Sequence, residues 1–130
     1  MRETILVVDD EEIILNLVRI VLDGAGYNIL GAGSGREAIA LCQTHTGPVH
    51  LALLDVMMPG MTDPELRERL RDQLPSVRVL FMSGFSYDQV AKQGIQADTD
   101  NFLAKPFTII ALLRSVKEAL EKTQYLRGSA

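Results

Sequence analysis

Residues 51–55 read LALLD, four apolar residues in a row followed by an aspartate. A strand with one buried face alternates apolar and polar residues, whereas an unbroken apolar run is typical of a strand covered on both faces. The stretch therefore predicts a central strand of a parallel sheet, with a carboxylate at its carboxyl end.

Similar strand-like runs lie on both sides of this stretch, and helical patterns separate them. The other expected strands are TILVV at 4–8, NILGA at 28–32, VRVLFM at 77–82 and FLA at 102–104. The expected helices span 11–23, 34–43, 63–73, 86–94 and 108–122. This alternation predicts an α/β fold, in which helices cover both faces of a five-stranded parallel sheet and the crossovers are right-handed.

Capping residues and apolar spacing locate the helices. Ser34 with Glu37 forms a capping box, Asp63-Pro64 suits a helix start, and Thr108 can cap the last helix. The apolar face expected for the first helix is Ile14, Leu17, Val18, Val21 and Leu22, and that of the last is Ile109, Leu112, Leu113, Val116 and Leu120.

The composition is that of one globular domain. The chain has 130 residues, of which 47% are hydrophobic and 23% charged, and we expect a domain over 1–123 with a tail or linker stub at 124–130. The net charge of −4 argues against direct binding to nucleic acid, and no apolar run is long enough for a bilayer. A single cysteine, Cys42, and the absence of a signal-peptide pattern favour a cytoplasmic location.

Polar residues follow four of the five expected strands. Asp9 and Asp10 follow the first strand, Asp55 the third, Ser83 the fourth and Lys105 the fifth. Because functional sites of open α/β sheets lie at the carboxyl ends of the strands, we expect these groups to converge if their strands are neighbours.

Such a convergence suits magnesium and phosphoryl chemistry. Three gathered carboxylates repel one another unless a cation joins them, and Mg²⁺ prefers oxygen ligands. A carboxylate can also attack phosphorus and form an acyl phosphate, whose oxygens the Lys105 ammonium and the Ser83 hydroxyl could then stabilise.

Four motifs together resemble the receiver domain of two-component response regulators. They are VVDDEE at 7–12, LLDVMMPGM at 53–61, MSG at 82–84 and FLAKPF at 102–107. The resemblance covers nearly the whole chain. It implies a flavodoxin-like (βα)5 three-layer sandwich whose sheet has the order 2-1-3-4-5.

The resemblance also implies roles for particular residues. Asp55 corresponds to the phosphoacceptor, Ser83 to the switch hydroxyl, Phe102 to the switch aromatic and Lys105 to the phosphate-binding lysine. The implied Mg²⁺ ligands are Asp9, Asp10, Asp55 and the backbone carbonyl of Met57, and the Lys105-Pro106 bond is expected to be cis.

Partners and context follow from the same resemblance. The phosphoryl donor would be a histidine kinase or a phosphotransfer protein, and the output surface would be helix four, strand five and helix five. Homodimers occur in this family. The chain would be a stand-alone regulator or a receiver excised from a hybrid histidine kinase, and the long 94–102 connection resembles the latter.

Two other functions are weighed against this one. A magnesium-dependent phosphatase with an aspartyl nucleophile usually carries a second acid two residues later, where this chain has Met57. A degenerate receiver that serves only as an interaction module would lack one of the key residues, and none is missing. Asp63 is a departure, because many receivers have glycine there; we interpret it as a helix cap.

Overall fold

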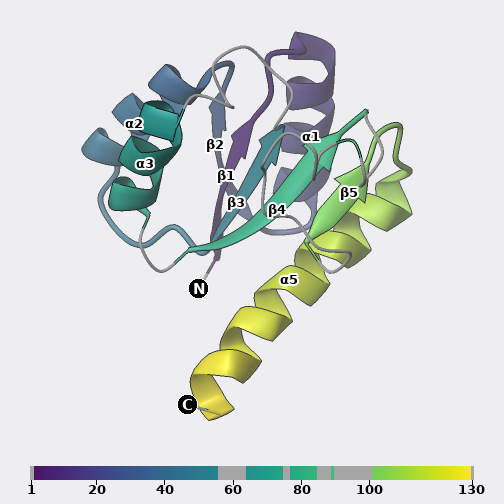
Figure 1. The fold of residues 1–130 in the computed structure, drawn as a ribbon. Helices are drawn as coiled ribbons and strands as arrows, with labels where there is room; N and C mark the ends of the chain where they lie inside the picture. The colour runs from purple at the N-terminus through teal and green to yellow at the C-terminus, as the bar shows by residue number, and fades with distance from the viewer. Residues whose placement is uncertain (1, 56–63, 75–76, 85–88, 90–100, 130) are drawn as a thin grey trace.

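The structure, a computed structural model, describes residues 2–55, 64–74, 77–84, 89 and 101–129 (Figure 1). Its elements are β1 (Thr4–Val8), α1 (Glu12–Gly24), β2 (Asn28–Ala32), α2 (Gly35–Thr44), β3 (Leu51–Asp55), α3 (Pro64–Gln73), β4 (Arg78–Ser83), β5 (Phe102–Ala104) and α5 (Ile109–Ser129). The Asp63 cap and, apart from Gln89, the helix expected over 86–94 lie outside the described residues.

The five strands form one parallel sheet in the order β2-β1-β3-β4-β5, which confirms the expected architecture. Helices α1 and α5 cover one face of the sheet, and α2 and α3 cover the other (Figure 1). The three-layer arrangement gives β1 and β3 two strand neighbours and a helical layer on each side, so all five residues of each strand are buried.

Alternation along the strands divides the interior into two cores. On the α1–α5 face, Ile5 and Val7 of β1 pack with Leu51 and Leu53 of β3. The intervening residues of the same strands, such as Leu6 and Leu54, belong to the core under α2 and α3. Successive side chains of a strand point to opposite faces, so the apolar runs at 4–8 and 51–54 supply both cores at once.

The predicted helix starts are made by local hydrogen bonds. Ser34 Oγ accepts a hydrogen bond of 3.1 Å from the Glu37 backbone N–H. Glu37 Oε2 in turn accepts one of 3.1 Å from the Gly33 N–H, one residue before the cap, so the capping box closes one position early. Thr108 Oγ1 accepts from the Ala111 N–H at 3.0 Å and caps α5.

Helix α5 differs from the sequence prediction at its carboxyl end and in the exposure of its first residue. It continues to Ser129 instead of ending near Lys122, and its last turns project past the sheet (Figure 1). The segment after Lys122 contains no proline, and its first glycine is Gly128, so no strong stop signal ends the helix earlier. Ile109, expected on the buried face, is 53% exposed because it lies in the first turn.

The first strand is anchored beyond its sheet ladder by His50. The Thr4 N–H donates to His50 Nδ1 at 2.9 Å, and the His50 N–H donates to the Thr4 carbonyl at 2.8 Å. The Lys105-Pro106 peptide bond is cis, as expected. None of the described helices is both long enough and apolar enough to span a bilayer.

Candidate functional site

The sheet brings its polar strand ends to one edge. Val8 pairs with Leu54 in the β1–β3 ladder, so Asp9, which follows β1, lies beside Asp55, the last residue of β3. Lys105 follows β5 and donates its backbone N–H to the Ser83 carbonyl at 2.8 Å. The convergence predicted from the strand order is therefore present.

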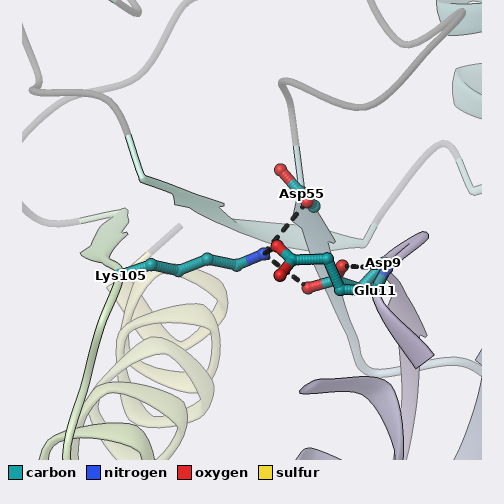
Figure 2. A network of polar contacts seen from close by, with 4 residues as sticks. All are labelled: Asp9, Glu11, Asp55 and Lys105. Atoms are coloured by element: carbon teal, nitrogen blue, oxygen red, sulfur yellow. Dashed lines mark hydrogen bonds and ion pairs between the residues drawn. The ribbon is translucent and has the colours of Figure 1, made fainter. Parts of the chain in front are cut away.

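Lys105 extends from the edge of the sheet into a group of three carboxylates (Figure 2). Its Nζ lies 2.7 Å from Asp9 Oδ2, 3.0 Å from Glu11 Oε1 and 3.0 Å from Asp55 Oδ2. One ammonium group faces three carboxylates, so the cluster keeps an excess of negative charge when all its members are ionised.

Burial makes this cluster electrostatically strong. The side chains of Asp9, Asp55 and Lys105 are 0%, 7% and 11% exposed. Burial raises the pKa of the Asp9 carboxyl, against the opposing effect of Lys105 and of the Glu11 N–H, which donates to Asp9 Oδ1 at 2.8 Å. Burial also tends to lower the pKa of Lys105, but the contacts of its ammonium group with the Asp9, Glu11 and Asp55 carboxylates outweigh this effect and raise that pKa.

Glu11 is a member of the site that the sequence analysis missed. It precedes α1 at the N-cap position, yet its side chain accepts no capping hydrogen bond. The carboxylate contacts Lys105 instead and remains 61% exposed. Its position directly after Asp9-Asp10 was the available signal, but an acid at a helix start is ordinarily explained by the helix dipole.

The donor set fits a divalent cation. Carboxylate oxygens of Asp9, Glu11 and Asp55 all lie within 4.8 Å of one another. Asp9 Oδ2 is buried and accepts no hydrogen bond among the described residues; its 2.7 Å approach to Lys105 Nζ is a charge contact only. A buried carboxylate oxygen with acceptor capacity left over, beside two further carboxylates, is the kind of oxygen ligand that Mg²⁺ takes.

A pocket of about 780 Å³ opens over this cluster. It is lined by Asp10, Glu11, Ile14, Leu17, Asp55, Gly84, Lys105, Pro106 and Phe107. Asp10 is thus at the pocket, exposed, but outside the cluster of three carboxylates. Ile14 and Leu17, expected only as core residues of α1, form part of its wall, and Leu17 is 40% exposed.

The remaining predicted site residues lie as follows. Ser83 is fully buried at the end of β4, next to the pocket-lining Gly84. Phe102, at the start of β5, is partly buried and pairs in register with Phe81. Met57 lies outside the described residues.

Comparison with known proteins gives a consistent result. The family model described as "Response regulator receiver domain" matches residues 5–117. The sensor kinase CckA of Brucella abortus is 38% identical over 121 residues, which are 92% of this chain and 13% of that protein. The probable transcriptional regulatory protein TcrX of Mycobacterium tuberculosis is 32% identical, over 92% of this chain and 50% of its own length.

Solved structures show the same fold. A CheY-like response regulator receiver domain protein from Methanospirillum hungatei superposes with a TM-score of 0.79 at 27% identity, covering 96% of this chain and 98% of its own. The receiver domain from the hybrid histidine kinase CckA has a TM-score of 0.71 at 32% identity, covering 90% of this chain and 98% of its own. The chain thus spans nearly all of these domains, but half or less of the two curated relatives.

Proposed function

Since the chain belongs to the response regulator receiver domain family, we propose that it accepts a phosphoryl group on Asp55 from the phosphohistidine of a histidine kinase or phosphotransfer protein. The observation that carries this proposal is the ion pair of Lys105 Nζ with Asp55 Oδ2 at 3.0 Å, between two residues that line the pocket at the carboxyl edge of the sheet. A nucleophilic carboxylate and a fixed ammonium group are there beside each other.

The transfer itself is a substitution at phosphorus. An oxygen of Asp55 supplies the electron pair for the new P–O bond, and the donor's leaving atom departs with the electron pair of the bond that breaks. The Lys105 ammonium is within reach of the oxygens that then carry the negative charge, and its low exposure strengthens that interaction.

We propose that Mg²⁺ is required, held by Asp9, Asp10, Asp55 and the backbone carbonyl of Met57. When bound, the ion would offset the charge of the carboxylates and of the phosphoryl oxygens. The exposed Asp10 carboxylate lines the pocket, which supports its inclusion. Glu11 forms an ion pair with Lys105 and would keep this contact with the ammonium group when the other carboxylates bind the metal.

Phosphorylation would act as a switch without substrate turnover. The added negative charge and acceptor oxygens lie near the buried Ser83, and we propose that Ser83 and Phe102 rearrange in response. The face expected to change is helix four with β5 and α5, which would bind a downstream protein. The chain would catalyse only its own phosphorylation and dephosphorylation.

We also propose the kind of protein in which this domain works. The similarity to a sensor kinase and to the receiver of a hybrid histidine kinase supports a place in such a kinase, whereas the similarity to transcriptional regulators supports a separate regulator. In either setting we expect the reaction in the cytoplasm, with no direct contact to nucleic acid.

Intact-mass spectrometry after incubation with acetyl phosphate tests the phosphoacceptor role. We expect one labile phosphoryl addition that requires Mg²⁺ and is absent from Asp55→Asn. Labelling of both proteins would place the phosphoryl group elsewhere. If neither acetyl phosphate nor a panel of phosphorylated kinases labels the wild type, the domain serves as an interaction module.

A further inference from the structure

The outer edge of β2 offers main-chain groups that no other described residue pairs with. β2 comes first in the sheet order β2-β1-β3-β4-β5, so β1 is its one strand neighbour in the sheet. The Asn28 N–H donates to the Glu3 carbonyl at 2.9 Å and therefore points toward β1. Successive residues of a strand direct their N–H and C=O groups to alternate sides, so those of Ile29 and Gly31 point outward. These two residues can pair with a further strand.

Arg19 of α1 places its guanidinium group over this edge. A Cβ atom on Gly31 would overlap Arg19 Nη2 and lie 2.9 Å from Arg19 Cζ, so the absence of a side chain at Gly31 makes room for the guanidinium. Arg19 is exposed and forms no ion pair or hydrogen bond within the described part of the chain. Its positive charge and its N–H donors are therefore available beside the open edge.

We propose that the β2 edge binds an extended peptide segment that carries an acidic side chain opposite Gly31. The main chain of the added strand would pair with Ile29 and Gly31, and its carboxylate would accept hydrogen bonds from the Arg19 guanidinium. Ile29 packs against the core under α1 and α5, on the face where Arg19 lies. The residue opposite Ile29 should therefore be apolar, which gives a pattern of one acidic and one apolar residue separated by any single residue.

Charge argues against a second copy of this chain as the occupant. Pairing of two β2 edges would bring two Arg19 guanidinium groups to one junction, and like charges on paired strands repel. β2 has the sequence NILGA and contains no acidic residue to offset them. An acidic segment of another protein meets the opposite charge instead. Because β2 and β5 lie at opposite ends of the sheet, the proposal does not depend on phosphorylation of Asp55.

An NMR titration with capped peptides tests this surface. The peptide Ac-STVTETS-NH2 carries valine and glutamate two positions apart, and Ac-STVTQTS-NH2 lacks the charge. The reversed sequences of both peptides present the same pattern to β2 in the antiparallel direction. In at least one direction we expect the amide signals of Ile29 and Gly31 to shift and their hydrogen exchange to slow. The glutamate peptide should bind about twofold to fivefold more tightly than the glutamine peptide.

Two variants separate the charge of the guanidinium from its position. Arg19→Gln removes the charge, whereas Gly31→Ala keeps the charge but occupies the space in which the guanidinium lies. Both variants should bind the glutamate and glutamine peptides with nearly equal affinity. Arg114→Gln is the matched control, because it removes an exposed arginine from α5, which packs over β3 and β4. This control should keep the wild-type preference for glutamate.

Three results would overturn the proposal. The first is that neither peptide direction shifts the amide signals of Ile29 and Gly31. The second is that Arg19→Gln keeps the wild-type preference for glutamate. The third is a shift of the same two signals with protein concentration alone, which would identify a second copy of the chain as the occupant.

Discussion

Lys105 Nζ lies 2.7 Å from Asp9 Oδ2, so the residues that follow the first and the last strand form a direct ion pair. The same nitrogen also contacts Asp55, which lies between them on the central strand β3. A single cation thus links three strand ends that are far apart in the sequence.

Replacement of Lys105 by methionine should lower the free energy of unfolding by about 1–3 kcal/mol in Mg²⁺-free buffer, because two buried carboxylates lose their cationic partner. Mg²⁺ should restore more stability to this variant than it adds to the wild type. Urea unfolding with and without Mg²⁺ measures both effects. The exposed Lys117→Met serves as control, and an equal gain from Mg²⁺ in all three proteins would contradict the prediction.

Asp9→Asn should stabilise the metal-free protein at neutral pH. Burial raises the pKa of the Asp9 carboxyl above 3.8, so the folded state binds its proton more tightly than the unfolded state. The contribution of Asp9 to the free energy of unfolding therefore declines as the pH rises from 3.8 through the raised pKa, and it remains reduced above that pKa.

Urea unfolding of wild type and Asp9→Asn between acidic and neutral pH tests this sign. The stability gain of the variant should increase with pH and should disappear when Mg²⁺ is added, since the variant lacks one ligand. A loss of stability at neutral pH without metal would mean that the ion pair with Lys105 outweighs the cost of burial.

Asp10→Asn and Glu11→Gln should have different effects on metal binding. Asp10 is the proposed ligand, so its variant should weaken Mg²⁺ binding at least about tenfold, as loss of one carboxylate from a small site implies. Glu11 is 61% exposed and pairs with Lys105, so Glu11→Gln should change the affinity much less. Calorimetric titration with Mg²⁺ measures both, and the reverse order would identify Glu11 as the ligand.

His50→Ala should destabilise the protein by about 1–2 kcal/mol, because the N–H of the buried Thr4 loses its acceptor, His50 Nδ1. His50→Asn offers a side-chain oxygen near the same position and should recover most of the loss. Thermal or urea unfolding compares the two variants. Equal destabilisation by both would show that the imidazole ring contributes by packing alone.

Much of this fold could be predicted because its strands carry a strong local signal. The unbroken apolar runs at 4–8 and 51–54 mark strands buried on both faces, and each predicted strand lies within one residue of its observed bounds. The polar residues that follow them converge because parallel strands end at one edge. The positions of Asp9, Asp55 and Lys105 beside one another thus follow from local patterns and topology together.

Other features depend on tertiary contacts that no local pattern contains. Glu11 could serve the helix dipole or a distant cation, and only the reach of Lys105 decides between them. Leu17 lies on the border of the apolar stripe of α1, so the placement of the neighbouring elements determines whether it enters the core or lines the pocket. The predicted end of α5 near Lys122 was wrong, because the sequence after this residue has no strong stop signal and the helix continues to Ser129.

Of the two cores of the interior, one adjoins the phosphoacceptor pocket and the other lies on the opposite face of the sheet. The pocket and its apolar wall adjoin the core under α1 and α5, whereas Cys42, the sole cysteine of the chain, is partly buried and packs against the core under α2 and α3. Burial raises the pKa of this thiol, so it should react slowly with alkylating reagents until that layer opens. Cys42 is therefore a built-in attachment point for a spectroscopic probe, which would report opening of the second layer while leaving the phosphoacceptor edge chemically untouched.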